Sequence, residues 1–146
     1  MKSFHVTSFV LALSSTLSIA RAAEPPTPTV DDCGAKQTQT DMNICFGVRY
    51  KAADAALEQA YLDLTVRLNE GSASAKLLGE AEDAWEKYRD KHCAFVASAT
   101  EGGTVQSTIL SQCLTDTTEA RAQEIRAQLN CVEGDLACVS PQQPDN

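Results

Sequence analysis

The chain has 146 residues, with 12 basic side chains against 20 acidic ones and a net charge of −8. This length suits one domain rather than two, and the acidic balance disfavours nucleic acid and anionic lipid as partners while favouring cationic proteins. The sequence has no phosphate-binding glycine loop, metal-ligand motif or basic patch with aromatic side chains, so no cofactor is expected.

Residues 1–22 have the three parts of a secretory signal peptide. Lys2 supplies the positive start, residues 9–19 an apolar run too short to span a bilayer, and Ala20-Arg21-Ala22 a cleavage site. We expect cleavage near Ala22 and export to the periplasm or the outside, without a membrane anchor. The first cysteine, Cys33, lies well past the apolar run, which argues against a lipoprotein. Without the leader, 10 basic residues face 20 acidic ones, a net charge of −10.

All the cysteines follow the leader: Cys33, Cys45, Cys93, Cys113, Cys131 and Cys138. An even number in a small exported domain indicates disulfides, whereas the wide spacings and the absence of C-x-x-C disfavour zinc. The pairs Cys33–Cys45, Cys93–Cys113 and Cys131–Cys138 would each close a short loop. A Cys45–Cys93 crosslink is an open alternative.

Residues 23–40, with three prolines, are expected to form an extended lead-in. Thr40 or Asp41 is placed to cap a first helix over residues 41–69, and Gly71 to end it. Apolar and aromatic residues recur along that helix at helical spacing: Met42, Phe46, Tyr50, Ala53, Leu57, Tyr61, Leu64 and Leu68.

A second helix is predicted over residues 74–98, and its short connection predicts an antiparallel hairpin with the first. Its expected packing seam is Leu78, Ala81, Trp85, Tyr88, His92 and Phe95. The glycines near residue 102 end it, and a third helix is predicted over residues 106–129. Its expected buried stripe is Leu110, Leu114, Thr118, Arg121, Ile125 and Leu129. The predicted fold is all-α, a small disulfide-braced three-helix bundle over residues 41–131, followed by a closing loop and disordered tail at 132–146.

Charged residues interrupt the expected apolar faces of all three helices. Asp54, Arg89 and Arg121 fall at similar depth in the bundle, so we expect them to form a buried charge network. Removing Asp54 would then cost about 3–5 kcal/mol. The alternative is an exposed anion-binding or catalytic pair.

Several segments together resemble the LprI-like lysozyme-inhibitor domain, a family of small exported bacterial proteins. The resemblance covers Cys33 to about Leu129. Its matching segments are Thr38-Gln39, Met42-Asn43-Ile44-Cys45, Ala53-Asp54-Ala55-Ala56-Leu57 with Tyr61, Ala84-Trp85-Glu86-Lys87-Tyr88-Arg89-Asp90 with Cys93, Gly102-Gly103, and Cys113-Leu114 with Thr118 and Arg121. Departures from the family pattern are Glu58, where Asn is frequent, Thr104, where Ser is frequent, and the added Cys131–Cys138 pair. The signature residues expected in the core are Leu57, Tyr61, Trp85, Tyr88, Leu114 and Thr118.

The resemblance implies an exported binding protein, similar to a lysozyme inhibitor, that acts non-covalently on a cationic enzyme. Candidate partner-binding residues are an acidic run and a turn: Glu80, Glu82, Asp83, Glu86, Asp90, Glu101, Gly102, Gly103 and Thr104. The plain alternative for both is a solvated face and an ordinary turn. Other hypotheses are a protein that neutralises a delivered toxin and a weak hydrolase using His92. No nucleophile, base and acid set is apparent and His92 lies on the expected seam, so we predict that the protein is not an enzyme.

Overall fold

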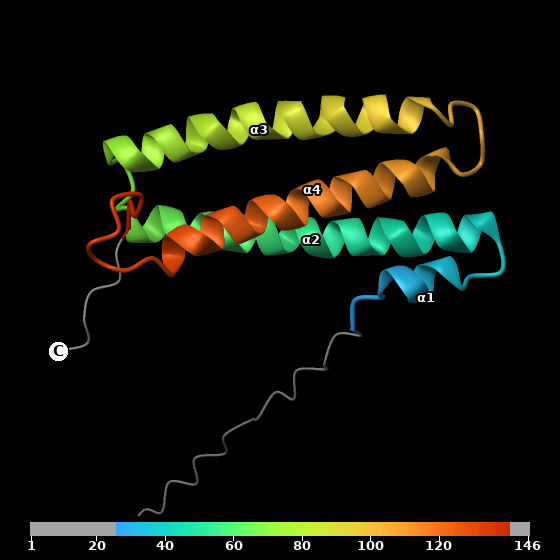
Figure 1. Ribbon diagram of the computed structural model, residues 1–146, viewed down its shortest axis with the longest axis horizontal. Helices are drawn as coiled ribbons and strands as arrows, with labels where there is room; N and C mark the ends of the chain where they lie inside the picture. The colour runs from blue at the N-terminus through green and yellow to red at the C-terminus, as the bar shows by residue number, and fades with distance from the viewer. Residues whose placement is uncertain (1–25, 141–146) are drawn as a thin grey trace, which may run out of the picture.

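The structure, a computed structural model, describes residues 26–140. The expected signal peptide and residues 141–146 of the expected tail lie outside the described residues. The elements are α1 (Val30–Gly34), α2 (Gln39–Arg67), α3 (Ala73–Ser98) and α4 (Gln106–Leu129), with no strand in the described part (Figure 1). The predicted all-α class is confirmed, and the three long helices begin and end within two residues of their predicted bounds.

The short helix α1 corrects the expectation of an extended lead-in. Thr29 caps it in a capping box, in which the backbone N–H of Asp32 donates to the Thr29 hydroxyl and the Asp32 carboxylate accepts from the Thr29 N–H. Five residues are too few to hold a helix alone. The Cys33–Cys45 disulfide fixes α1 to α2, so tertiary structure stabilises this short helix. The sequence did not predict it because the prolines just before it indicate an extended chain.

Helix α2 begins and ends slightly before its predicted bounds. Its cap is Thr38, whose hydroxyl accepts from the backbone N–H of Asp41 at 3.1 Å, rather than Thr40 or Asp41. After its last turn, Asn69 has a φ of 64° and Gly71 a φ of 86°. The left-handed position directly after the helix is therefore Asn69, a residue that tolerates it, and Gly71 shapes the turn that follows.

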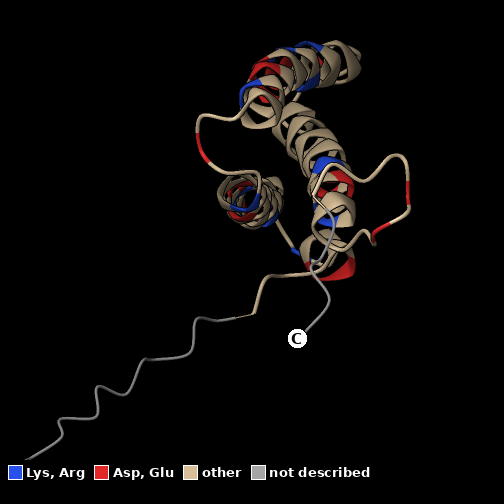
Figure 2. Ribbon diagram, turned by 90° about the vertical axis from the view of Figure 1, so that its left-hand side faces the viewer, with Lys and Arg blue, Asp and Glu red and all other residues tan. Residues whose placement is uncertain are grey.

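The three long helices are arranged with α4 packed along both α2 and α3 (Figure 1). Helices α2 and α3 run antiparallel on either side of the short turn, as predicted (Figure 1), but they make little direct backbone contact because each packs mainly against α4. The end-on view shows α2 and α3 joined by that turn, with α4 beside them (Figure 2). Small buried side chains let α4 approach its two neighbours closely: Thr108, Thr115, Thr118 and Ala122.

The packed face of α3 is rotated relative to the predicted seam. Leu78 and Trp85 are partly buried, as expected, but Tyr88, His92 and Phe95 are exposed. Placing Tyr88 and His92 in the core was therefore wrong. The buried face is formed by small or polar residues: Ala75, Arg89, Cys93 and Ala97. The Cys93–Cys113 disulfide turns this face of α3 toward α4. The apolar side chains of Tyr88 and Phe95 are therefore left exposed to solvent.

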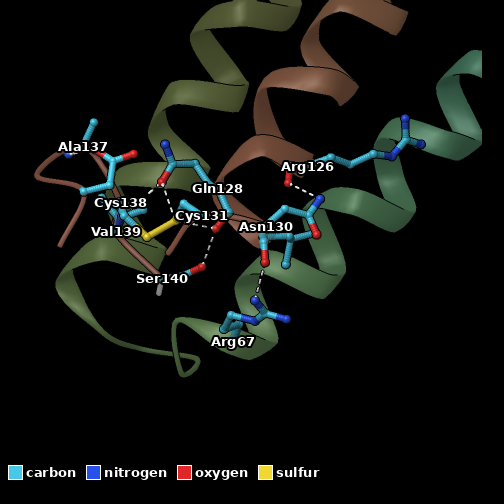
Figure 3. The surroundings of a disulfide bond; sticks show 11 residues. Arg67, Arg126, Gln128, Asn130, Cys131, Ala137, Cys138, Val139 and Ser140 are labelled. Atoms are coloured by element: carbon cyan, nitrogen blue, oxygen red, sulfur yellow. Dashed lines mark hydrogen bonds between the residues drawn. A yellow bond between two sulfur atoms is a disulfide. The ribbon is translucent and has the colours of Figure 1, made fainter. Parts of the chain in front are cut away.

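The disulfides are Cys33–Cys45, Cys93–Cys113 and Cys131–Cys138, so each closes a short loop, and Cys45 does not bond to Cys93. Figure 3 shows the last of them beside Gln128. The Gln128 carbonyl accepts from the Ser140 hydroxyl at 2.9 Å, and its side-chain oxygen accepts from the Val139 N–H at 3.0 Å. These two residues, expected in a disordered tail, are held against the end of α4.

Candidate functional site

Arg89 is the centre of a cluster between α3 and α2. Its Nη1 donates to Asp54 Oδ1 at 3.3 Å and its Nε to Asp90 Oδ1 at 3.0 Å, while its guanidinium carbon lies 5.0 Å from the Trp85 ring centre and 5.8 Å from that of Tyr50. Burial alone would lower the pKa of Arg89, but the hydrogen bond to Asp90 and the surrounding negative charge raise it. The cluster therefore keeps a permanent cation inside the fold.

The expected three-member buried charge network does not form. Asp54 is on the surface, and Arg121 bonds instead to Glu82, with Nε to Oε1 at 2.7 Å, and to Glu124, with Nη1 to Oε2 at 2.8 Å. Burial alone would lower the pKa of Arg121, yet its bonds to these two glutamates raise it. There are thus two separate clusters, and in each a partly or fully buried arginine bonds to one carboxylate on its own helix and to one on a neighbouring helix.

A groove of about 390 Å³ runs between α2 and α3. We call it the acidic groove, and it is lined by Asp54, Leu57, Glu58, Tyr61, Gly79, Glu82, Asp83 and Glu86. Leu57 and Tyr61 give it apolar surface, and a Cβ added at Gly79 would lie 3.5 Å from the Tyr61 hydroxyl. A side chain at this position would therefore fill space that the glycine leaves beside Tyr61.

The acidic groove carries negative charge that the described part of the chain does not neutralise. Asp54 and Glu82 are paired with arginines, but Glu58, Asp83 and Glu86 form no ion pair with any described residue. Exposed carboxylates beside apolar surface match a lysine or arginine side chain, which has an apolar stem and a charged end. The groove is therefore complementary in charge and polarity to a lysine or arginine side chain.

The structure brings together only part of the predicted partner-binding set. Glu82, Asp83 and Glu86 line the acidic groove, whereas Glu80 lies outside it, 3.9 Å from Lys76, and Asp90 bonds to Arg89. The predicted partner-binding set left out Asp54 and Glu58, because the acidic run that defined the set lies on α3 whereas these two residues belong to α2. The position of Glu58, three residues before Tyr61 and beside the buried stripe of α2, was the sequence signal that could have placed it in the groove.

The turn after α3 is separate from the acidic groove. It begins about 18 Å along α3 from Glu86, since the twelve helical steps from Glu86 to Ser98 rise roughly 1.5 Å each. Its exposed residues Glu101, Gly102, Gly103 and Thr104 are linked to their surroundings: the Thr104 carbonyl accepts from Asn43 Nδ2 at 3.1 Å, and the Gly103 N–H donates to the Thr100 carbonyl at 2.9 Å. Gly102 has a φ of 74°, which favours glycine there.

His92 lies on the surface rather than in the core. Its ring stacks on that of Tyr88, with centroids 5.4 Å apart and planes at 12°. Within residues 26–140 there is no group of three or more histidine, cysteine, aspartate or glutamate side chains that could hold a metal ion.

Comparison with known proteins places these features in context. The family model described as "Lysozyme inhibitor LprI" matches residues 31–125, from the start of α1 to the last turns of α4. The "Uncharacterized protein R02472" of Rhizobium meliloti (strain 1021) is 30% identical over 125 residues, covering 76% of this chain and 86% of that protein. No solved structure matches significantly. The matched region contains the acidic groove and excludes the Cys131–Cys138 loop.

Proposed function

The chain belongs to the lysozyme inhibitor LprI family, and we propose that it is an exported protein that binds a cationic enzyme such as lysozyme and inhibits it without covalent chemistry. The observation that carries this proposal beyond the family match is the acidic groove. Three of its carboxylates, Glu58, Asp83 and Glu86, have no ion-pair partner among the described residues.

The groove suits a protein partner better than a small molecule. It is a shallow depression whose carboxylates come from two helices, so it presents charge at the surface rather than an enclosed chamber. A lysine or arginine of the target would lay its stem on Leu57 and Tyr61 and pair its charge with the carboxylates. The attraction between an acidic inhibitor and a basic enzyme would also speed their encounter.

The protein inhibits the enzyme by occupying its surface. The inhibitor uses no reactive group: its cysteines within the described residues are all in disulfides. The bundle supplies a stable, disulfide-braced body, and the enzyme is blocked because a rigid helix pair covers the surface that its polymeric substrate must cross. A rigid surface loses little conformational entropy on binding, which favours affinity.

Export is part of the proposal. The leader-like residues 1–22 and three disulfides both fit an oxidising compartment outside the cytoplasm. Of the helices described, none is both long and apolar enough to cross a membrane.

The test is a lysozyme activity assay with the purified mature protein at low and at moderate ionic strength. Inhibition is expected to be strongest at low salt, because screening weakens attraction between exposed charges. The variant His92→Ala should inhibit equally, since His92 lies outside the acidic groove. Failure of the mature protein to bind or inhibit any basic lysozyme in dilute buffer would overturn the proposal.

A further inference from the structure

The surface of α3 that faces away from α4 carries an apolar seam that is interrupted once, at Lys91. We call it the outer seam, and it consists of Leu77, Ala81, Ala84, Tyr88 and Phe95. The exposed fractions of its three large side chains are 65% for Leu77, 58% for Tyr88 and 76% for Phe95. On a helical projection it lies opposite Cys93 and Arg89, which face the protein.

The spacing of the outer seam is that of a helix contact. Its residues follow one another at steps of 4, 3, 4 and 7, which is the pattern of apolar positions where two helices pack along each other. No other described helix covers it, since α3 packs on α4 through its opposite face. Two alanines at its middle would let a second helix approach closely.

Charges beside the seam point to a second copy of this chain rather than to a cationic enzyme. Of the five lysines in the described residues, three, Lys76, Lys87 and Lys91, lie on α3. These lysines would repel a basic partner. Glu80 and Lys87 lie on the same flank of the seam, one before and one after Ala84 in the sequence, so Lys87 of one α3 can face Glu80 of a second α3 that runs antiparallel to it.

We propose that the outer seam is the contact between two copies, with the two α3 helices antiparallel about a twofold axis midway between Ala81 and Ala84. In this register Tyr88 packs on Leu77 of the second copy, Ala81 faces Ala84, and Lys87 pairs with Glu80. Each contact occurs twice by symmetry. The acidic groove opens on another side of α3, through Asp83 and Glu86, so each copy keeps its groove free.

The first test is light scattering and sedimentation of the mature protein over concentrations up to about 1 mM, where even a dimer with a dissociation constant of about 1 mM is populated. A concentration-dependent dimer is expected. Glu80→Lys and Lys87→Glu should each raise the dimer dissociation constant at least tenfold, by opposing like charges twice, and the double variant should restore it. Lys51→Glu makes the same charge change as Lys87→Glu on α2, away from α3, and should have no effect.

A second test locates the axis. Ala84→Cys should form a disulfide-linked dimer under mild oxidation, whereas Ala55→Cys, exposed on α2, should not. A monomer at every concentration, a dimer indifferent to the Glu80 and Lys87 exchange, or equal crosslinking by the two cysteine variants would overturn the proposal. A monomer whose lysozyme binding is lost in Tyr88→Ser would also overturn it and assign the seam to the enzyme. Groove-dependent inhibition does not require the dimer, so the two proposals fail separately.

Discussion

Arg89 and Asp54 form an ion pair in which only one partner is buried. Their Nη1 and Oδ1 atoms are 3.3 Å apart, but the Arg89 side chain is 9% exposed and that of Asp54 is 55% exposed. The arginine lies against the aromatic rings of Trp85 and Tyr50 and also donates to Asp90, whereas Asp54 lies on the solvent side. The cluster therefore stabilises the fold mainly through the buried contacts of Arg89, and the ion pair with Asp54 contributes less to the free energy of unfolding.

Replacing the two partners should have unequal effects on stability. Arg89→Ala is expected to lower the free energy of unfolding by about 2–4 kcal/mol, because it removes buried packing as well as charge. Asp54→Ala should cost less than about 1 kcal/mol, as for other exposed ion pairs. Arg89→Met, which keeps most of the packing, should fall between them. Urea unfolding measures all three, and equal losses for Arg89→Ala and Asp54→Ala would contradict this assignment.

The sequence allowed the helices to be predicted because their signals are local. Apolar spacing and the glycines near residue 102 mark α2, α3 and α4 without any tertiary information. The position of α4 between its neighbours was not predictable in this way. Its inner surface is made of Thr115, Thr118 and Ala122, which are small or polar and so carry no apolar signal.

The acidic groove was half predictable for a related reason. Asp83 and Glu86 stand out as part of an acidic run on one helix, whereas Glu58 lies on α2 and joins them only through the fold. The seam of α3 was misassigned because helical spacing shows that a face is apolar but not what covers it. Tyr88 and Phe95 keep the spacing of a packing surface and yet face outward.

Thr118 carries a buried hydroxyl that finds no hydrogen-bond partner among the described residues. Thr118→Val should therefore raise the free energy of unfolding, by about 1 kcal/mol, since it replaces an unsatisfied polar atom with a methyl group of similar size. The matched control is Thr115→Val. The Thr115 hydroxyl donates to the Ser111 carbonyl at 2.7 Å, so that change should bring no gain. Thermal melts of both variants test this, and a clear loss of stability in Thr118→Val would show that its hydroxyl is satisfied.

The Cys93–Cys113 bond should contribute more to stability than the Cys131–Cys138 bond. The first closes a loop of 20 residues and has a fully buried sulfur on α3, and the second closes only 7. Replacing both cysteines of each pair by alanine should cost about 3 and about 2 kcal/mol on loop length alone. Because Cys93 also holds α3 against α4, its loss should add to that difference. Chemical unfolding of the two double variants gives the comparison, and a larger loss from the Cys131–Cys138 variant would refute it.

Tyr50 should make stability fall at alkaline pH. Burial raises the pKa of Tyr50, Arg89 opposes that rise, and the carboxylate of Asp54 adds to it. The unfolded chain then loses this proton near pH 10 while the folded chain keeps it, so stability is full below about pH 10 and declines as the pH rises toward the folded pKa. Tyr50→Phe removes this contribution. The difference in unfolding free energy between wild type and Tyr50→Phe should change between pH 8 and 11, and a constant difference would contradict the assignment.

Calorimetry of the mature protein with a basic lysozyme at low salt, with and without the groove charges, tests whether the acidic groove binds the enzyme. The variant Glu58→Gln, Asp83→Asn, Glu86→Gln removes three carboxylates from the acidic groove. Its matched control, Glu70→Gln, Asp116→Asn, Glu133→Gln, removes three exposed carboxylates elsewhere. We expect the groove variant to bind at least about tenfold more weakly, since each exposed pair contributes up to about 1 kcal/mol, and the control variant to lose much less affinity. Equal losses from the two variants would contradict it, because binding would then depend on net charge rather than on the groove.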